Sequence, residues 1–363
     1  MSITEKLTSS SPEDISTRSS TMTPEEILNW AEKAPTPILK KAADLVCRTH
    51  HGDKVWLRGL VEISNTCIQN CLYCGIRRDN EKVNRYRLTE EQIIETVKTG
   101  YDAGLRTFVL QGGEDGYFNA QRMERLIGNI KNLTLGEAAL TLSLGIFSKE
   151  VYKRWKKAGA DRYLIRFETS DPDLHLWLRD GVTLKERLEA LKDLKDLGYE
   201  TGSGFMVGLP RETAEIRRNN ALLCRELELD MVGIGPFIPH PQTPLKEAPQ
   251  ESMDLCERSV ATVRLLLPKA HMPATTAAGS LDKKGREKVL AGGANVLMPN
   301  ITPVMVKKDY ELYPGKICLD ESGLECMDCL DIRVRTVGKR LSKGKGGAWV
   351  KVPSIEVSTG SET

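Results

Sequence analysis

Short β-rich runs alternate with longer helical patterns along most of this 363-residue chain, and the alternation limits the folds open to it. A helix between two such runs is typical of a crossover connection, which makes successive strands parallel. The eight runs expected to be strands are 56–64, 105–111, 139–144, 161–167, 199–207, 230–236, 272–276 and 294–298. This count predicts an α/β fold with a closed (β/α)8 TIM barrel, and an open partial barrel of six strands is the alternative.

Three further segments flank the expected barrel. Thr23 and Pro24 are typical of a helix start, because Thr caps the first turn and Pro fits the first helical position. The residues before them are polar and Ser/Thr-rich, and the basic residues 333–351 are expected to be a solvated end. The predicted segments are a disordered tail at 1–22, N-terminal helices at 23–50, the barrel at 51–310 and a cysteine-containing C-terminal segment with the basic tail at 311–363.

The charge balance and the cysteine content exclude several classes of protein. Lys and Arg total 52 against 50 for Asp and Glu, which argues against a nucleic-acid binder that works by phosphate neutralisation. No apolar run approaches the roughly 20 residues that a membrane span needs. Nine cysteines without a secretory signal predict a reducing compartment, so we expect a cytoplasmic protein.

Cys67, Cys71 and Cys74 form a C-x3-C-x2-C motif directly after the first expected strand. Three thiolates this close together can hold three irons of a [4Fe-4S] cluster and leave the fourth iron open to an external ligand. A zinc site is the alternative, but zinc normally takes four ligands, and no Cys or His at finger spacing supplies a fourth. The motif therefore favours an iron–sulfur cluster that takes part in a reaction.

Polar and Gly-rich segments follow the other expected strands, where a barrel gathers its active site. Gly112, Gly113 and Glu114 follow Gln111 and would let backbone groups approach a ligand, although a plain strand-to-helix turn is the alternative. Arg166 and Glu168 share one face of a strand, either as ligand-binding groups or as a structural ion pair. The Gly/Pro-dense segment 233–241 suits packing against a flat ring, whereas His240 within it is expected to be structural.

A second cysteine group, Cys318, Cys326 and Cys329, lies near the C-terminus. Three thiolates without an obvious fourth ligand repeat the logic of the first motif and make a second cluster one reading. Zinc, a disulfide or a surface Cys-x-x-Cys are the alternatives. The remaining cysteines lie in helical patterns and are expected to be buried small hydrophobes.

These motifs resemble those of the biotin-synthase-like radical S-adenosylmethionine (SAM) enzymes, and among them the [FeFe]-hydrogenase maturases. The resemblance extends over roughly residues 50–335 and includes the C-terminal cysteines, which match an optional second cluster of that family. The matching strings are at 70–80, 160–164, 231–241, 273–276 and 313–318.

The resemblance implies a barrel of the radical SAM type and a specific chemistry. SAM would bind the open iron, and one electron from the cluster would release methionine and a 5′-deoxyadenosyl radical. In the maturases this radical attacks a small, anionic iron–carbonyl–cyanide cysteine complex. Expected partners are a one-electron donor such as ferredoxin or flavodoxin and the other hydrogenase maturases, a second radical SAM enzyme and a scaffold GTPase.

The resemblance also assigns roles to individual residues around the three cysteines. The residues expected near SAM are Tyr73, Gln111, Gly112, Gly113, Glu114, Glu168, Arg187, Phe237 and Ile238. Those expected to line the substrate cavity are Arg166, Met231, Thr275, Thr276, Met298 and Tyr313.

Two positions depart from the family pattern: Phe167 replaces an expected His, and Gly112 replaces an expected Ser. Position 167 is expected to flank the cavity. The possibility therefore stays open that the chain is a paralogue with another substrate, such as a methylornithine-synthase-like enzyme. Biotin synthase is disfavoured because no expected strand carries a cysteine for a sulfur-donating cluster. A non-catalytic iron–sulfur carrier or zinc scaffold would leave the Gly-Gly-Glu segment without a purpose.

Overall fold

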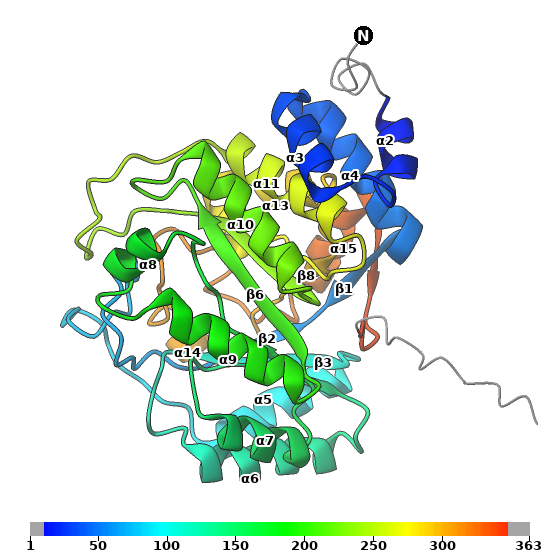
Figure 1. The fold of residues 1–363 in the computed structure, drawn as a ribbon. Coiled ribbons are helices and arrows are strands. Elements are labelled where there is room, and N and C mark those ends of the chain that lie inside the picture. The colour runs from blue at the N-terminus through cyan, green and yellow to red at the C-terminus, as the bar shows by residue number, and fades with distance from the viewer. Residues whose placement is uncertain (1–10, 348–363) are drawn as a thin grey trace, which may run out of the picture.

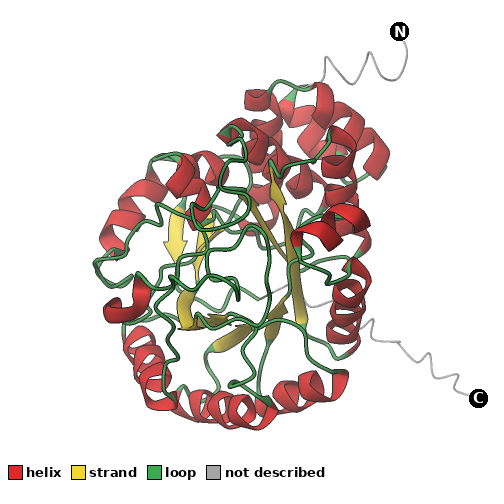
Figure 2. Cartoon of the chain, turned by 90° about the vertical axis from the view of Figure 1, so that its left-hand side faces the viewer, coloured by secondary structure: helices red, strands yellow, loops and turns green. Residues whose placement is uncertain are grey.

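The barrel is built on a six-stranded parallel sheet whose strands follow chain order. The computed structural model describes residues 11–347, and Figure 2 shows its strands surrounded by a ring of helices. The six strands are β2 (Gly59–Ser64), β3 (Thr107–Gly112), β4 (Ala139–Ser143), β5 (Arg162–Leu164), β6 (Glu200–Val207) and β7 (Met231–Pro236).

Two further stretches of extended backbone close this sheet into a barrel. The Val232 N–H donates to the His271 carbonyl at 2.9 Å, and Pro273 forms a parallel bridge with Val296 in β8 (Val296–Leu297). The Leu60 N–H then donates to the Pro299 carbonyl at 2.9 Å, which returns the pairing to β2. The closed barrel is therefore confirmed, and the open six-strand alternative is wrong.

Several expected strands differ from the observed ones. The run 161–167 shortens to β5 and the run 294–298 to β8. The run 56–64 divides into β1 (Lys54–Leu57) and β2 at Arg58. The run 272–276 makes only isolated bridges, because Pro273 has no N–H to donate to a ladder.

Helices cover the outside of the barrel, and their apolar faces pack on the strands. No helix within residues 11–347 is long and apolar enough to cross a membrane. The barrel helices are α5 (Glu90–Asp102), α6 (Ala120–Leu133), α7 (Lys149–Ala158), α8 (Pro172–Leu178), α9 (Leu184–Asp196), α10 (Ala214–Glu226), α11 (Met253–Leu266), α12 (Thr276–Leu281), α13 (Gly285–Leu290), α14 (Val304–Lys307) and α15 (Met327–Arg335).

Three N-terminal helices, α2 (Pro12–Arg18), α3 (Pro24–Lys33) and α4 (Thr36–His51), lie together at one end of the molecule beside α11 (Figure 1). Helix α3 starts with a capping box, in which Thr23 and Glu26 satisfy each other's backbone N–H groups. Helix α2 corrects the expectation that residues 1–22 are disordered, because Ile15 is buried and anchors it against α4. Residues 1–10 lie outside the described part.

The C-terminal segment is also more ordered than expected. Strand β9 (Arg340–Ser342) pairs in parallel with β1, and the chain then passes beneath the amino ends of the strands. The Lys345 carbonyl accepts hydrogen bonds from Thr107 Oγ1 and from Arg162 Nη2, both at 2.9 Å. The solvated end predicted for 333–351 is therefore wrong for part of this segment. Besides the Lys345 carbonyl, the buried Lys339 Nζ makes hydrogen bonds, to the carbonyls of Leu290 at 2.7 Å and Ala294 at 3.1 Å, whereas residues 343–345 are exposed. The rest of the basic tail lies outside the described residues.

We expect Arg162→Ala to lower the free energy of unfolding by about 3 kcal/mol, because it breaks a buried ion pair. The Arg162 side chain is 1% exposed and also donates from Nε to Glu200 at 2.6 Å. Arg340→Ala is the control, since its pair with Asp53 is exposed and contributes about 0.5 kcal/mol. Urea denaturation of both variants checks this, and equal losses would contradict it.

Candidate active site at the mouth of the barrel

A cavity of about 350 Å³ opens at the carboxyl ends of the strands. Segments that follow six or more different strands meet there, as a barrel requires. The sequence-predicted residues that line it are Cys67, Cys71, Tyr73, Cys74, Gln111, Gly112, Gly113, Glu114, Arg166, Glu168, Arg187, Phe237, Ile238, Thr275, Thr276, Met298, Tyr313, Cys318 and Cys326.

Two predicted residues do not line the cavity. Met231 is the first residue of β7, so it lies at the amino end of the barrel, where its Sδ accepts a hydrogen bond from Arg58 at 2.8 Å. Its expected contact with substrate is therefore corrected. Cys329 is exposed on α15.

The three cysteines of the first motif share one wall of the cavity. Burial raises the pKa of the Cys67, Cys71 and Cys74 thiols, because desolvation disfavours a thiolate. A bound cationic metal reverses this preference, because it stabilises thiolate ligands. The Glu114 N–H also points at Cys67 Sγ from 3.3 Å, a contact that favours a thiolate. The donor set fits a cluster held by three cysteines.

Arg85 holds the loop that carries these cysteines. Its guanidinium donates to the carbonyls of Asn65 and Arg77 at 2.7 Å, of Ile76 at 2.8 Å and of Asn80 at 3.1 Å. The loop lacks regular secondary structure, so its carbonyls need such a donor. Arg85 could not be found from the sequence, because a side chain that donates hydrogen bonds to backbone carbonyls leaves no periodic pattern.

His240 packs against this loop from the outside. A Cβ at Gly75 would lie 2.6 Å from His240 Nε2, so only glycine permits this approach. His240 Nδ1 accepts a hydrogen bond from the Gln242 N–H at 3.1 Å. This placement agrees with the structural role expected of His240.

Glu114 is the centre of a charged network in the cavity wall. Its Oε1 accepts hydrogen bonds from Arg187 Nη2 at 2.8 Å and from Arg179 Nη2 at 3.0 Å, and its Oε2 accepts one from Gln69 at 2.8 Å. Burial raises the pKa of Glu114, whereas Arg179 and Gln69 act to lower it. Two guanidinium groups against one carboxylate leave net positive charge for an anionic ligand group.

The sequence patterns did not indicate Arg179. It follows α8, a short helix that the alternation of strands and helices does not predict. It connects this network to the cysteine loop through Tyr73, whose Oη lies 3.3 Å from Arg179 Nη1. Tyr73 precedes Cys74, so one arginine contacts both the loop and the carboxylate.

The expected Arg166–Glu168 pair is present on the cavity wall. Arg166 Nε lies 3.2 Å from Glu168 Oε2, and Arg166 Nη2 is buried without a hydrogen-bond partner. Glu168 adopts a left-handed conformation with φ of 65°, which a non-glycine residue rarely accepts. Its backbone is fixed by hydrogen bonds of 3.0 Å with Gly204 and Met206. The strained turn directs the carboxylate into the cavity.

Phe167 does not flank the cavity as expected. The side chain is fully buried and stacks on Phe205 with ring centroids 5.9 Å apart. Phe167 lies three residues beyond the end of β5, and its ring enters the core while its neighbours Arg166 and Glu168 line the cavity. Gly112 does line the cavity, where a Cβ would lie 3.3 Å from the Ser64 carbonyl oxygen.

The deeper part of the cavity carries another ion pair. Lys316 Nζ lies 2.5 Å from Glu62 Oε1 and 3.0 Å from the Tyr310 carbonyl oxygen. Burial raises the pKa of Glu62, and the Lys316 cation opposes this. Arg286 also lines this region, which therefore suits a small anion.

Comparisons with known proteins agree with this chemistry. Residues 61–223 match the model of the radical SAM superfamily. The chain is 44% identical over 322 residues to the [FeFe] hydrogenase maturase subunit HydE of Thermotoga maritima, covering 89% of this chain and 92% of that protein. It is 31% identical to 3-methylornithine synthase of Methanosarcina acetivorans, covering 69% and 71%.

Solved structures show the same fold. Methylornithine synthase superimposes with a TM-score of 0.74 at 25% identity, covering 94% of this chain and 97% of that one. The [FeFe]-hydrogenase maturase HydG gives a TM-score of 0.76 at 19% identity, covering 94% and 78%. The HydG likeness concerns the fold alone.

We expect Gly113→Ala to reduce iron binding, because a Cβ there would lie 2.2 Å from the Thr66 carbonyl oxygen and 2.7 Å from Cys67 Cβ. The added methyl displaces the cysteine loop. Gly116→Ala is the matched control, since nothing lies within 4 Å of its Cβ position. Iron and sulfide per chain after anaerobic reconstitution provide the measurement. Equal binding by both variants would show that the loop tolerates the displacement.

Proposed function

Since the chain belongs to the HydE family of [FeFe]-hydrogenase maturases within the radical SAM superfamily, we propose that it generates a 5′-deoxyadenosyl radical during assembly of the hydrogenase di-iron centre. The observation that carries this proposal is the convergence of the three-cysteine loop and the Glu114 network on one cavity. A carrier or zinc scaffold has no use for such a network beside its metal.

Cys67, Cys71 and Cys74 are the proposed ligands of a [4Fe-4S] cluster. When bound, the cluster supplies the electron that cleaves SAM to methionine and the adenosyl radical. Cys67, Cys71 and Cys74, which all line the cavity, would supply the three thiolates, and the amino and carboxylate groups of SAM would supply the remaining ligands. The Glu114 N–H supports the Cys67 ligand by a hydrogen bond to its sulfur.

The surrounding residues orient SAM. Glu114 is the acceptor for the SAM ammonium group, and its bonds to two arginines hold its carboxylate in place before SAM arrives. Arg187 and Arg179 favour the SAM carboxylate electrostatically. Glu168, turned inward by its strained backbone, is the acceptor for the ribose hydroxyls.

Apolar residues complete the SAM pocket on its adenine side. Phe237 is 2% exposed and packs with Met206, Leu174 and Leu178 in a small second core. Ile238 follows it on the cavity wall. A rigid apolar surface of this kind suits a flat base and excludes water from the radical.

The deeper cavity is the proposed substrate site. Arg166, with an unpartnered buried Nη2, and Arg286 present positive charge, and Tyr313 and Thr276 line the same cavity. Thr275 and Met298 line the same region. This arrangement supports a small anionic substrate, and the family indicates an iron–carbonyl–cyanide cysteine complex.

We also propose a second iron–sulfur cluster at Cys318, Cys326 and Cys329. A one-electron donor such as ferredoxin or flavodoxin and the other hydrogenase maturases are the proposed partners. The cellular compartment stays the prediction made from the sequence.

Cys71→Ala is expected to abolish SAM cleavage, whereas Cys326→Ala keeps most of it, because only the first motif holds the catalytic cluster. The assay is anaerobic reconstitution with iron and sulfide, followed by dithionite, SAM and quantification of 5′-deoxyadenosine. Similar losses in both variants would give the C-terminal cysteines a catalytic role. No product from the reconstituted wild type, despite a good cluster spectrum, would favour the carrier.

Glu114→Gln should weaken SAM binding about 10- to 100-fold, since a charge-assisted hydrogen bond contributes about 1.5–3 kcal/mol. Glutamine keeps the size of the side chain but removes its charge and replaces one of its two acceptor oxygens by an NH2 donor. Glu124→Gln, which removes an exposed carboxylate paired with Arg154 on the surface, is the control. Anaerobic calorimetry with the reconstituted protein measures both affinities, and an unchanged affinity in Glu114→Gln would remove its assigned role.

Methylornithine synthase is the rival activity, given its 31% identity to this chain. The higher identity to HydE favours the maturase, and Phe167 no longer supports a different substrate because it lies in the core. Incubation with SAM, dithionite and lysine separates the two, since methylornithine formation would overturn the maturase assignment.

A further inference from the structure

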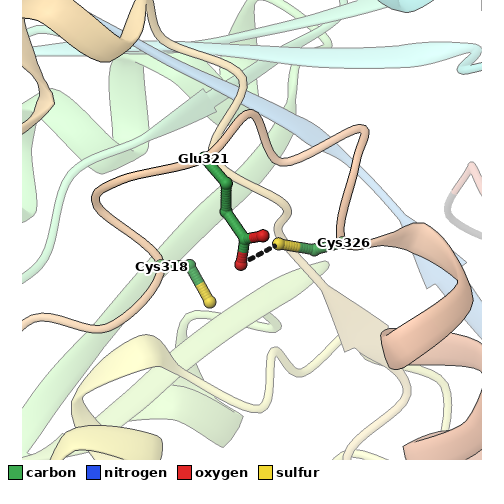
Figure 3. Close-up of side chains that lie close together, drawn as sticks. All are labelled: Cys318, Glu321 and Cys326. Atoms are coloured by element: carbon green, nitrogen blue, oxygen red, sulfur yellow. Dashed lines mark hydrogen bonds between the residues drawn. The ribbon is translucent and has the colours of Figure 1, made fainter.

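The C-terminal cysteines lie beside a carboxylate that their sequence spacing does not indicate. Cys318, Glu321 and Cys326 come together so that their sulfur and oxygen atoms all lie within 4.8 Å of one another. Cys326 Sγ donates a hydrogen bond to Glu321 Oε1 at 2.8 Å (Figure 3). Two soft donors and one hard donor therefore converge on one point, which is the arrangement of a metal site.

The backbone holds this group in place. Cys318 adopts a left-handed conformation with φ of 60°, which turns the chain back toward Glu321. The Glu321 carbonyl accepts a hydrogen bond of 2.5 Å from Lys307 Nζ, and Lys307 is fully buried. Cys326 caps the start of α15, whose packing on the barrel fixes its position.

The two cysteines face the cavity, whereas the carboxylate faces the solvent. Cys318 and Cys326 line the same cavity as the catalytic cysteines, whereas Glu321 is exposed and does not. Cys329 lies three residues beyond Cys326 on α15, where it is exposed, and its sulfur is not among the atoms that lie within 4.8 Å of one another. Three cysteines supply one ligand fewer than a four-ligand site needs, and Glu321 is the carboxylate that lies beside two of them.

The local charges favour such a group of anions. The Lys307 cation interacts electrostatically with Cys318 and Cys326. The Arg333 cation interacts in the same way with Cys318 and Cys329. Arg333 is itself fixed by Glu287, at 2.5 Å from Nε. Two anchored cations offset the charge that thiolates and a carboxylate bring together.

We propose that Glu321 is the fourth protein ligand of the accessory iron–sulfur cluster, beside Cys318, Cys326 and Cys329. This rests on the second cluster of the proposed function. A carboxylate is a harder ligand than a thiolate, so it distinguishes one iron from the others. It also closes the site to exogenous ligands, in contrast to the open iron of the catalytic motif.

The experiment uses the full chain with Cys67, Cys71 and Cys74 all replaced by Ala, so that only the accessory site can hold iron. Into this background go Glu321→Gln, Glu321→Cys and the control Asp320→Asn, which changes an exposed neighbouring carboxylate paired with Lys308. Circular dichroism checks that each variant folds. Each is reconstituted anaerobically with iron and sulfide, and its Mössbauer spectrum and rate of iron loss to a chelator are measured.

Glu321→Gln is expected to lose iron at least fivefold faster than the background, and to lose the Mössbauer signal of one oxygen-ligated iron. Glu321→Cys should restore slow loss with an all-thiolate spectrum, and Asp320→Asn should match the background. The proposal fails if Glu321→Gln and the background have the same spectrum and the same iron loss. Zinc uptake without an iron–sulfur chromophore also overturns it. SAM cleavage does not enter these readouts, so failure of the proposed function is detected separately.

Discussion

The barrel closes where the backbone of Leu60 pairs with the segment at Pro299 and Ile301, and the active-site cavity exists only because of this closure. The Leu60 N–H donates to the Pro299 carbonyl, and the Ile301 N–H donates to the Leu60 carbonyl at 2.8 Å. These two bonds join the segment after β8 to β2 and complete the ring. Once the ring is closed, segments separated by more than two hundred residues face one another across a single cavity.

Closure also creates an interior in which every charge needs a partner, because desolvation disfavours isolated ions. Glu114 lies between Arg179 and Arg187, Glu62 pairs with Lys316, and Arg166 pairs with Glu168. These pairs fix polar side chains before any ligand binds. Since cations outnumber anions around Glu114, the site is prepared for a ligand that carries a carboxylate.

Side chains line one end of the barrel, and backbone covers the other. The mouth is lined by side chains from loops, and its cysteine loop is held by Arg85. The opposite end is covered by the backbone after β9, whose carbonyls accept hydrogen bonds from Arg162 and Thr107. The barrel is covered at the amino ends of its strands and lined by fixed charges at their carboxyl ends. Such an interior suits radical chemistry, because water and mobile side chains would react with the radical.

Local signals were sufficient for much of this. The strand–helix alternation predicted the closed barrel, because its period and its connections follow from nearby residues. The cysteine spacing marked the loop proposed to bind the cluster, and the Gly-Gly-Glu segment marked its neighbour on the next strand. Helix α2 and strand β9 were not predicted, since both are stabilised by contacts with other parts of the chain rather than by their own composition.

The fold class, the three-cysteine motif and the strand ends at which polar groups gather could all be predicted from local patterns. The pairs of side chains that meet became visible only in the folded chain: Arg179 at Glu114, Arg85 at the loop carbonyls, Glu321 at Cys318 and Cys326, and Phe167 in the core. The reason is physical. Periodicity and spacing report which face a residue occupies within its own element, but a partner across the barrel depends on register and closure, which no local pattern encodes.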